Sequence, residues 1–304
     1  MYHSSDPRNT LSSNGSRSSD LTTKYGRPQL LELHNLDASA QTPAGSRTWL
    51  VRTSNYLVAY HEVLGGDGVV LLPAVADRLV LVPHDQESIT VELHSRGPGN
   101  APVTVEAASI LVVPGPARLT AHTAATIIEA VHFDDLSAAP RALNEDFYTV
   151  PVPGVALRPG RRVPGLQHAI TVYSMSDYRS SPDRFGRIVC SSNIMANLLE
   201  IEDGPRDETR LSPHSHDDFE QCCITTRGRY VHHWRTPWTP DSTTWRDDMH
   251  PVYDSPGIAI IPPGVMHTAN STTAGANQMI DLFAPPRADF TDKGWVLNAE
   301  DCAL

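Results

Sequence analysis

The sequence predicts an all-β protein that contains two tandem β-barrels. Short apolar runs of strand length, such as residues 109–113 and 257–261, are each followed by a turn that contains proline and glycine. The chain holds 25 prolines and 19 glycines among 304 residues, which suits a turn-rich β architecture, and no long helical repeat of apolar residues stands out. Similar strand and turn phrases occur in both halves of the chain, and this repetition predicts two β domains of the same kind.

Four segments are expected along the chain. Residues 1–28 are predicted to be a disordered, serine-rich tail, because residues 1–24 hold seven serines and no apolar run. Residues 29–147 are expected to form the first barrel, and residues 169–304 the second. Residues 148–168, which are rich in proline and glycine, are the predicted linker. A chain of this length accommodates two domains of ordinary size.

Four residues of the second half are candidate ligands for one metal ion. His214 and His216 are separated by one residue, so on a strand they point to the same side, roughly 6.5 Å apart along the backbone. Glu220 begins the next apolar run, which an antiparallel pairing could bring beside the histidines. His267 follows the turn at residues 262–264 and is the fourth candidate.

At these residues the chain resembles the cupin superfamily, whose motifs are Gly-x5-His-x-His-x3 or 4-Glu-x6-Gly and Gly-x5-Pro-x-Gly-x2-His-x3-Asn. The match covers residues 194–290. It departs from the family pattern in three places: no glycine lies six residues before His214, seven residues separate Glu220 from Gly228, and Asn270 is one place early. The resemblance implies a jelly-roll β-barrel. It also implies that a metal ion is held by His214, His216, Glu220 and His267.

The first half contains a degenerate copy of the same motifs. Residues 72–80 align with residues 212–220, and residues 109–119 align with residues 257–267. The four ligand positions then fall on Ala74, Ala76, Val80 and Leu119. None of these side chains can coordinate a metal ion. We therefore expect a bicupin with a single metal site in the second barrel, and a first barrel whose former site is filled by aliphatic side chains.

Three histidines and one carboxylate would hold one divalent ion and leave one or two exchangeable positions, unlike a closed structural zinc site. Fe²⁺ is the favoured ion, with Mn²⁺, Ni²⁺ and Zn²⁺ as alternatives. The leading hypothesis is an oxygen-dependent dioxygenase of an enolic, phenolic or keto-acid substrate. Two alternatives stay open: a metal-dependent isomerase or lyase of a sugar acid or related carbonyl compound, and a non-catalytic module that binds a small molecule.

The charge and composition of the chain limit the classes of molecule that it is expected to bind. The net charge of −11 argues against nucleic acid, and no apolar stretch approaches the roughly 18 residues of a membrane helix. We expect a soluble, cytoplasmic protein that binds a small-molecule substrate, with a homo-oligomer such as a dimer as an open alternative. Four cysteines in a chain of this size suit a reducing compartment.

Several other residues have two interpretations. Cys222 shares a strand face with Glu220 and could line the site, but a small buried apolar side chain is the favoured interpretation. His232 and His233 are adjacent on a strand, so at most one of them is expected to face the interior. Residues 235–256 form a long insertion that contains Trp238 and Trp245, and this insertion is either a rim of the site or a packed surface loop.

Overall fold

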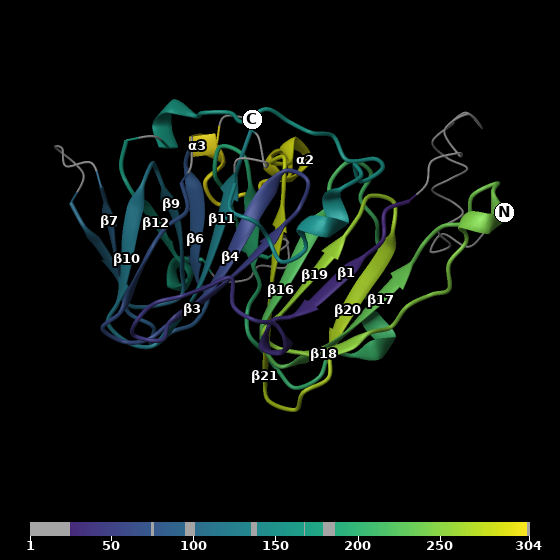
Figure 1. Ribbon diagram of the computed structural model, residues 1–304, viewed down its shortest axis with the longest axis horizontal. Helices are drawn as coiled ribbons and strands as arrows, with labels where there is room; N and C mark the ends of the chain where they lie inside the picture. The colour runs from purple at the N-terminus through teal and green to yellow at the C-terminus, as the bar shows by residue number, and fades with distance from the viewer. Residues whose placement is uncertain are drawn as a thin grey trace.

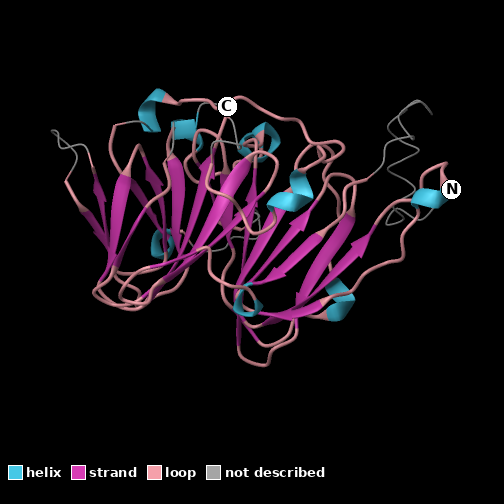
Figure 2. Ribbon diagram, viewed as in Figure 1, coloured by secondary structure: helices cyan, strands magenta, loops and turns pink. Residues whose placement is uncertain are grey.

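The computed structural model describes residues 25–73, 76–94, 101–134, 139–166, 168–178 and 186–302. Two β-barrels lie side by side, one formed mainly by the blue and teal part of the chain and one by the green and yellow part (Figure 1). Helices are short and lie outside the sheets (Figure 2). The predicted all-β architecture is confirmed. The predicted disordered tail is residues 1–28, and residues 1–24 lie outside the described part of the chain.

The first barrel consists of two sheets whose strands pair antiparallel. The larger sheet has the order β12 (Thr171–Ser174), β9 (Ser109–Val113), β6 (Arg78–Val82), β11 (Ala125–His132), β4 (Tyr56–Val63), β3 (Arg47–Arg52) and β2 (Ala40–Gln41). The smaller sheet has the order β5 (Gly68–Val70), β10 (Ala117–Ala121), β7 (Ile89–Leu93) and β8 (Val103–Val105).

The second barrel repeats this plan. Its larger sheet has the order β1 (Gln29–Glu32), β19 (Gly257–Ile261), β16 (Gln221–Arg227), β21 (Ala276–Phe283), β14 (Met195–Leu198) and β13 (Ile188–Cys190), and β15 (Glu202–Asp203) also pairs with β21. Its smaller sheet has the order β18 (Val252–Asp254), β17 (Arg229–Arg235) and β20 (Met266–Ser271).

The helices of the described residues are one or two turns long. The α-helices are α2 (Ala288–Asp292) and α3 (Ala299–Cys302). The 3-10 turns are η2 (Leu33–Asn35), η4 (Glu145–Tyr148), η5 (Pro164–Leu166), η6 (Met175–Asp177), η7 (Glu208–Arg210) and η8 (Ser242–Thr244). Within the described ranges, no helix is long and apolar enough to cross a membrane.

The two barrels exchange strands. β1 comes from the start of the chain but pairs with β19 of the second barrel, where Gln29 lies opposite Ile260. β12 follows the linker but pairs with β9 of the first barrel, where Thr171 lies opposite Val112. Figure 1 shows the purple strand β1 among the green and yellow strands. The segments 29–147 and 169–304 therefore do not correspond strand for strand to the two barrels.

The larger sheets of the two barrels pack against each other. One apolar cluster contains Leu79 and Leu81 of β6 together with Cys222 and Ile224 of β16. The Tyr56 hydroxyl donates a hydrogen bond across this interface to a backbone carbonyl of the second barrel at 2.9 Å. Because side chains alternate along a strand, the intervening residues of β6 and β16 point into the two barrel interiors. This alternation decides which residues reach the metal-ligand histidines.

The cysteines divide into two groups. Cys190 on β13 and Cys302 in α3 form a disulfide, with their Cα atoms 6.3 Å apart, and this bond ties the end of the described chain to the second barrel. Sequence analysis did not anticipate this pairing. Cys222 and Cys223 are free thiols and are both buried. Cys222 faces the apolar layer between the barrels, in agreement with its favoured interpretation.

Candidate metal centre

Three of the four predicted ligands lie close together at one end of the second barrel. His267 is the second residue of β20, and His214 pairs with it in a short antiparallel bridge. Each of these residues donates its backbone N–H to the carbonyl of the other, at 3.0 Å and 2.8 Å. The carbonyl of His216 accepts the N–H of Gly264, in the turn that precedes β20. The main chain therefore fixes the positions of all three histidines.

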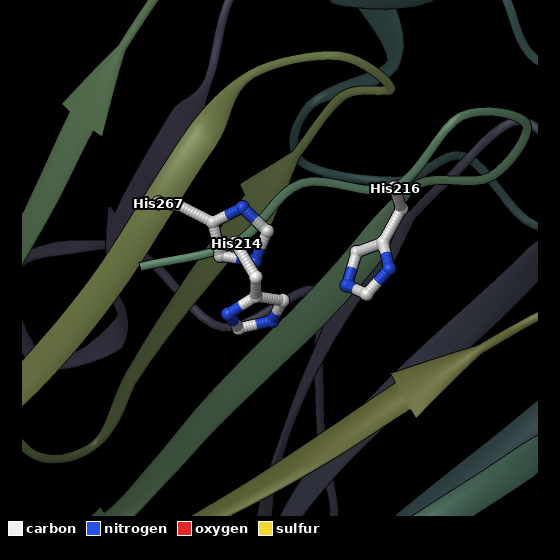
Figure 3. Close-up of side chains that lie close together, drawn as sticks. All are labelled: His214, His216 and His267. Carbon is white, nitrogen blue, oxygen red and sulfur yellow. The ribbon is translucent and has the colours of Figure 1, made fainter. Parts of the chain in front are cut away.

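The histidine rings converge (Figure 3). One ligand nitrogen from each of His214, His216 and His267 can be chosen so that all three lie within 4.8 Å of one another. Tetrahedral or octahedral coordination at about 2.1 Å requires nitrogens roughly 3 to 3.5 Å apart, so a small movement would complete it. His267 is only 3% exposed whereas His214 is exposed, which makes the cluster accessible from solvent on one side.

Hydrogen bonds hold two of the rings in the tautomer that a metal ion requires. Nδ1 of His267 donates to the carbonyl of Val265 at 2.9 Å, and Nδ1 of His214 donates to the carbonyl of Ser212 at 2.8 Å. Each ring then carries its lone pair on Nε2. Nε2 of His267 is buried and has no hydrogen-bond partner. A buried nitrogen without a partner is destabilising in a metal-free protein, so this donor set fits a divalent ion.

Burial keeps these rings neutral. It lowers the pKa of His267 to about 3, and the neighbouring His214 contributes in the same direction. Burial, and again the neighbouring His214, lowers the pKa of His216 to about 4. Neutral imidazole is the form that coordinates a metal, so these two side chains are available as ligands at neutral pH.

The structure does not bring Glu220 to the histidines. Its carboxylate accepts the backbone N–H of Ser54 at 2.6 Å and the hydroxyl of Tyr148 at 3.0 Å. Ser54 lies between strands β3 and β4 of the first barrel, and Tyr148 is the first residue of the predicted linker. Glu220 therefore faces the contact between the barrels, where burial raises its pKa. The physical reason is strand alternation: Glu220 has the same parity as Cys222, which also faces that contact.

Gln221 occupies the place predicted for the carboxylate. Its Oε1 lies 2.5 Å from Nε2 of His216. Its Nε2 donates to the carboxylate of Asp281 at 3.1 Å and lies 3.2 Å from Sγ of Cys223. Because Asp281 fixes the orientation of the amide, the amide oxygen is turned toward the histidines. The sequence did contain the signal, since six residues separate Gln221 from Gly228, as the cupin motif requires.

His232 and His233 point in opposite directions, as strand alternation predicts. His232 is buried in the second barrel, and its Nδ1 lies 2.8 Å from the hydroxyl of Tyr253. His233 faces outward and lies 2.7 Å from both His250 and Asn270. Neither residue belongs to the histidine cluster, as far as the described residues show.

The first barrel carries no imidazole at the equivalent positions. Leu71 donates its N–H to the carbonyl of Ala117 at 3.0 Å, as His214 does to His267. Leu71 and Ala117 therefore take the places of the two histidines, two residues away from the predicted position at Leu119. The positions predicted from sequence that can be placed, Ala76, Val80 and Leu119, are buried, and Ala74 lies outside the described residues.

An ion pair fills part of the corresponding interior. Arg78 on β6 lies opposite Val113 on β9, and Gln221 on β16 lies opposite Ile261 on β19. Val113 and Ile261 each end a strand directly before a turn that contains proline, so Arg78 and Gln221 are equivalent positions in the two barrels. Nη1 of Arg78 lies 2.7 Å from Oε1 of Glu129, and both side chains are fully buried. The expectation of a purely aliphatic filling is therefore wrong at this position. A guanidinium cannot coordinate a cation, so Arg78 cannot take the role of a metal ligand.

Comparison with solved structures identifies the fold. The chain is similar to an oxalate decarboxylase of Lactobacillus farciminis in complex with formate, with a TM-score of 0.56 and 11% identity over 85% of this chain and 86% of that one. It is also similar to a mutant of the Bacillus subtilis oxalate decarboxylase, with a TM-score of 0.55 and 12% identity over 85% of this chain and 77% of that one.

Comparisons of sequence identify no relative. No protein-family model matches the chain, and no curated protein matches it. The structural similarity is nevertheless spread over both barrels, since it covers 85% of the chain. The protein therefore has the fold of a double cupin, with two jelly-roll barrels and a group of three histidines in the second.

Proposed function

We propose that the protein is a metal-dependent enzyme that acts on a small oxyanionic molecule bound at His214, His216 and His267. The observation that carries this proposal is the convergence of three imidazoles, one of them exposed, with no carboxylate among them. A divalent ion held by neutral ligands keeps its full positive charge, and this charge favours an anionic substrate.

Oxygen-dependent chemistry is our first choice of reaction. Three protein ligands leave about three positions of an octahedral ion open, enough for two substrate oxygens and one further small molecule. A bound divalent ion would supply Lewis acidity, and iron or manganese would also allow molecular oxygen to be the co-substrate. A keto acid offers two adjacent oxygens and fits this arrangement, as does an enolic or phenolic substrate that carries a second oxygen beside the first.

The residues around the cluster have distinct roles in this proposal. Phe219 packs against the ring of His216, with ring centroids 4.3 Å apart, and shields that side from water. Asp281 orients the amide of Gln221, whose oxygen can accept a hydrogen bond from an O–H group of the substrate. The exposed side of His214 is the direction of substrate entry.

A lyase is the second candidate, and the structural neighbours favour it. They are oxalate decarboxylases, and the Bacillus subtilis enzyme has Mn(II) centres. That chemistry comes to this chain only by similarity of fold, at 11 to 12% identity. The substrate of such an isomerase or lyase would be a sugar acid or a related carbonyl compound.

Turnover assays separate these candidates. Iron-, manganese-, nickel- and zinc-loaded protein would be screened with enolic, phenolic and keto-acid substrates and with sugar acids. Oxygen uptake is measured with an electrode, and products are analysed under anaerobic conditions. Oxygen uptake that depends on substrate supports the dioxygenase. Turnover that persists without oxygen and with zinc supports the isomerase or lyase, and saturable binding without turnover supports a binding module.

A further inference from the structure

A cavity away from the three clustered histidines is lined by residues of the insertion at 235–256. Its volume is about 190 Å³, and it forms between the start of the described chain and the insertion at residues 235–256. Its walls are Tyr25, Arg27, Thr236, Thr243, Thr244, Trp245 and Arg246. None of the three clustered histidines lines it. At roughly 30 Å³ per water molecule, the cavity has room for a ligand equivalent to about six waters.

The cavity is positively charged although the protein is strongly acidic. Arg27 and Arg246 both line it, and no lining residue is acidic. The proximity of the two guanidiniums contributes to a lowered pKa of Arg246, although burial is the larger cause. No side chain in the described part of the chain forms an ion pair with Arg27. Two cations facing one cavity without a carboxylate favour an anionic ligand.

Arg246 is held in place before any ligand binds. Its Nη1 donates to the carbonyl of Gly26 at 2.7 Å, and its Nη2 donates to the carbonyl of Tyr25 at 2.9 Å. Carbonyl oxygens are neutral partners, so these bonds orient the guanidinium without neutralising its charge. The arrangement is therefore preorganised for an oxyanion.

Trp245 forms a rigid, flat wall of the cavity. Its ring stacks on Trp238 at a centroid distance of 4.4 Å and an interplanar angle of 7°, and its indole N–H donates to the carbonyl of Thr239 at 2.8 Å. The stacking and the hydrogen bond already hold this indole in one orientation, so it loses little conformational entropy when a planar ligand packs against it. Thr236 is buried beside it and supplies a hydroxyl at the cavity wall.

We propose that this cavity is a binding site for a small organic oxyanion, a carboxylate or a phosphate ester carried on a flat apolar group. Arg27 and Arg246 contact the oxyanion, and Trp245 contacts the apolar group. The site is separate from the histidine cluster. It also explains the insertion, whose residues 243–246 form most of one wall.

Isothermal titration calorimetry tests this site with four probes: benzoate, phenyl phosphate, inorganic phosphate and benzyl alcohol. We expect one equivalent of benzoate or phenyl phosphate to bind, and the tighter of the two identifies the oxyanion. Benzyl alcohol lacks the charge and should not bind measurably. Inorganic phosphate lacks the flat group and should bind more weakly than phenyl phosphate.

Variants locate the binding. Arg27→Gln should weaken binding about ten-fold, because it removes a charged hydrogen-bond donor, and Arg27→Lys should keep part of the affinity. Arg27 is exposed and forms no ion pair with a side chain of the described residues, so we expect this substitution to leave the described fold intact. Arg118→Gln, at an exposed position on β10, is the matched control and should bind as the wild type does.

A further variant tests whether the oxyanion binds at His214, His216 and His267 instead of in the cavity. His267→Ala should leave benzoate and phenyl phosphate affinity unchanged, because His267 does not line the cavity. Loss of binding in His267→Ala, unchanged binding in Arg27→Gln, or equal binding of benzyl alcohol would each overturn the proposal. None of these results bears on whether the histidine cluster holds a metal.

Discussion

Glu220 and Gln221 are adjacent in the chain but face opposite sides of the larger sheet. The carboxylate of Glu220 accepts the N–H of Ser54 at 2.6 Å, at the contact with the first barrel. The amide oxygen of Gln221 lies 2.5 Å from Nε2 of His216, inside the second barrel. The carboxylate of Glu220 thus links the two barrels, and the amide of Gln221 contacts the group of three histidines.

Substitutions at these two positions should have different effects on metal binding. Gln221→Leu should weaken divalent metal binding about ten-fold, as loss of a group that orients a ligand histidine typically does. Gln221→Glu should strengthen it, because a carboxylate replaces a neutral amide. Glu220→Gln should leave it unchanged. Competition with a fluorescent chelator measures all three, and a Glu220→Gln variant that no longer binds metal would restore Glu220 as a ligand.

The buried ion pair between Arg78 and Glu129 should affect the free energy of unfolding but not the metal content of the protein. Arg78→Met leaves the carboxylate of Glu129 buried without its guanidinium partner, with Nε2 of His61 at 3.6 Å, and should lower the free energy of unfolding by about 3–5 kcal/mol. Replacing both residues with Met and Leu should recover most of this loss. Urea unfolding measures the effect, with metal content as the control. A single substitution that costs nothing would mean that the pair is not formed.

Strand exchange predicts that the barrels depend on each other. Removing residues 1–32 deletes β1, uncovers the edge of β19 and exposes apolar surface, at an expected loss of about 2 kcal/mol or more. Removing residues 1–24 is the matched control, because it leaves β1 in place. Thermal unfolding followed by circular dichroism compares the two chains. Equal stability would show that β1 contributes nothing to the second barrel.

His232 should make the metal-free protein less stable in mild acid. Burial lowers its pKa from 6.5 to about 3 in the folded state, and His267 adds to this effect. Between these values the unfolded chain binds a proton that the folded chain does not. Stability should therefore fall as pH decreases from about 6.5, by up to ~1.4 kcal/mol per pH unit for this residue. His232→Phe should reduce that slope in unfolding measurements at pH 4 to 7, whereas an unchanged slope would contradict the assignment.

The sequence predicted the fold and most of the candidate site. Short strands, proline-containing turns and the repeated phrases predicted two β domains, and the cupin resemblance implied that these domains are barrels. The spacing of His214, His216 and His267 predicted their convergence. Glu220 was the predicted fourth ligand, but its side chain lies on the other face of the strand from Gln221, which contacts His216. A shift of one residue reverses the direction of a side chain, and the sequence spacing alone does not separate these two positions. The exchange of β1 and β12 depends on contacts between distant segments, and local patterns do not report such contacts.

Metal content per chain is the most direct test of the central claim that His214, His216 and His267 form the single metal site. Elemental analysis should find close to one divalent ion per wild-type chain, with loss of the ion in His214→Ala and His267→Ala while circular dichroism shows both barrels still folded. Two tightly bound equivalents in the wild type, or full retention of the ion in His267→Ala, would contradict the account.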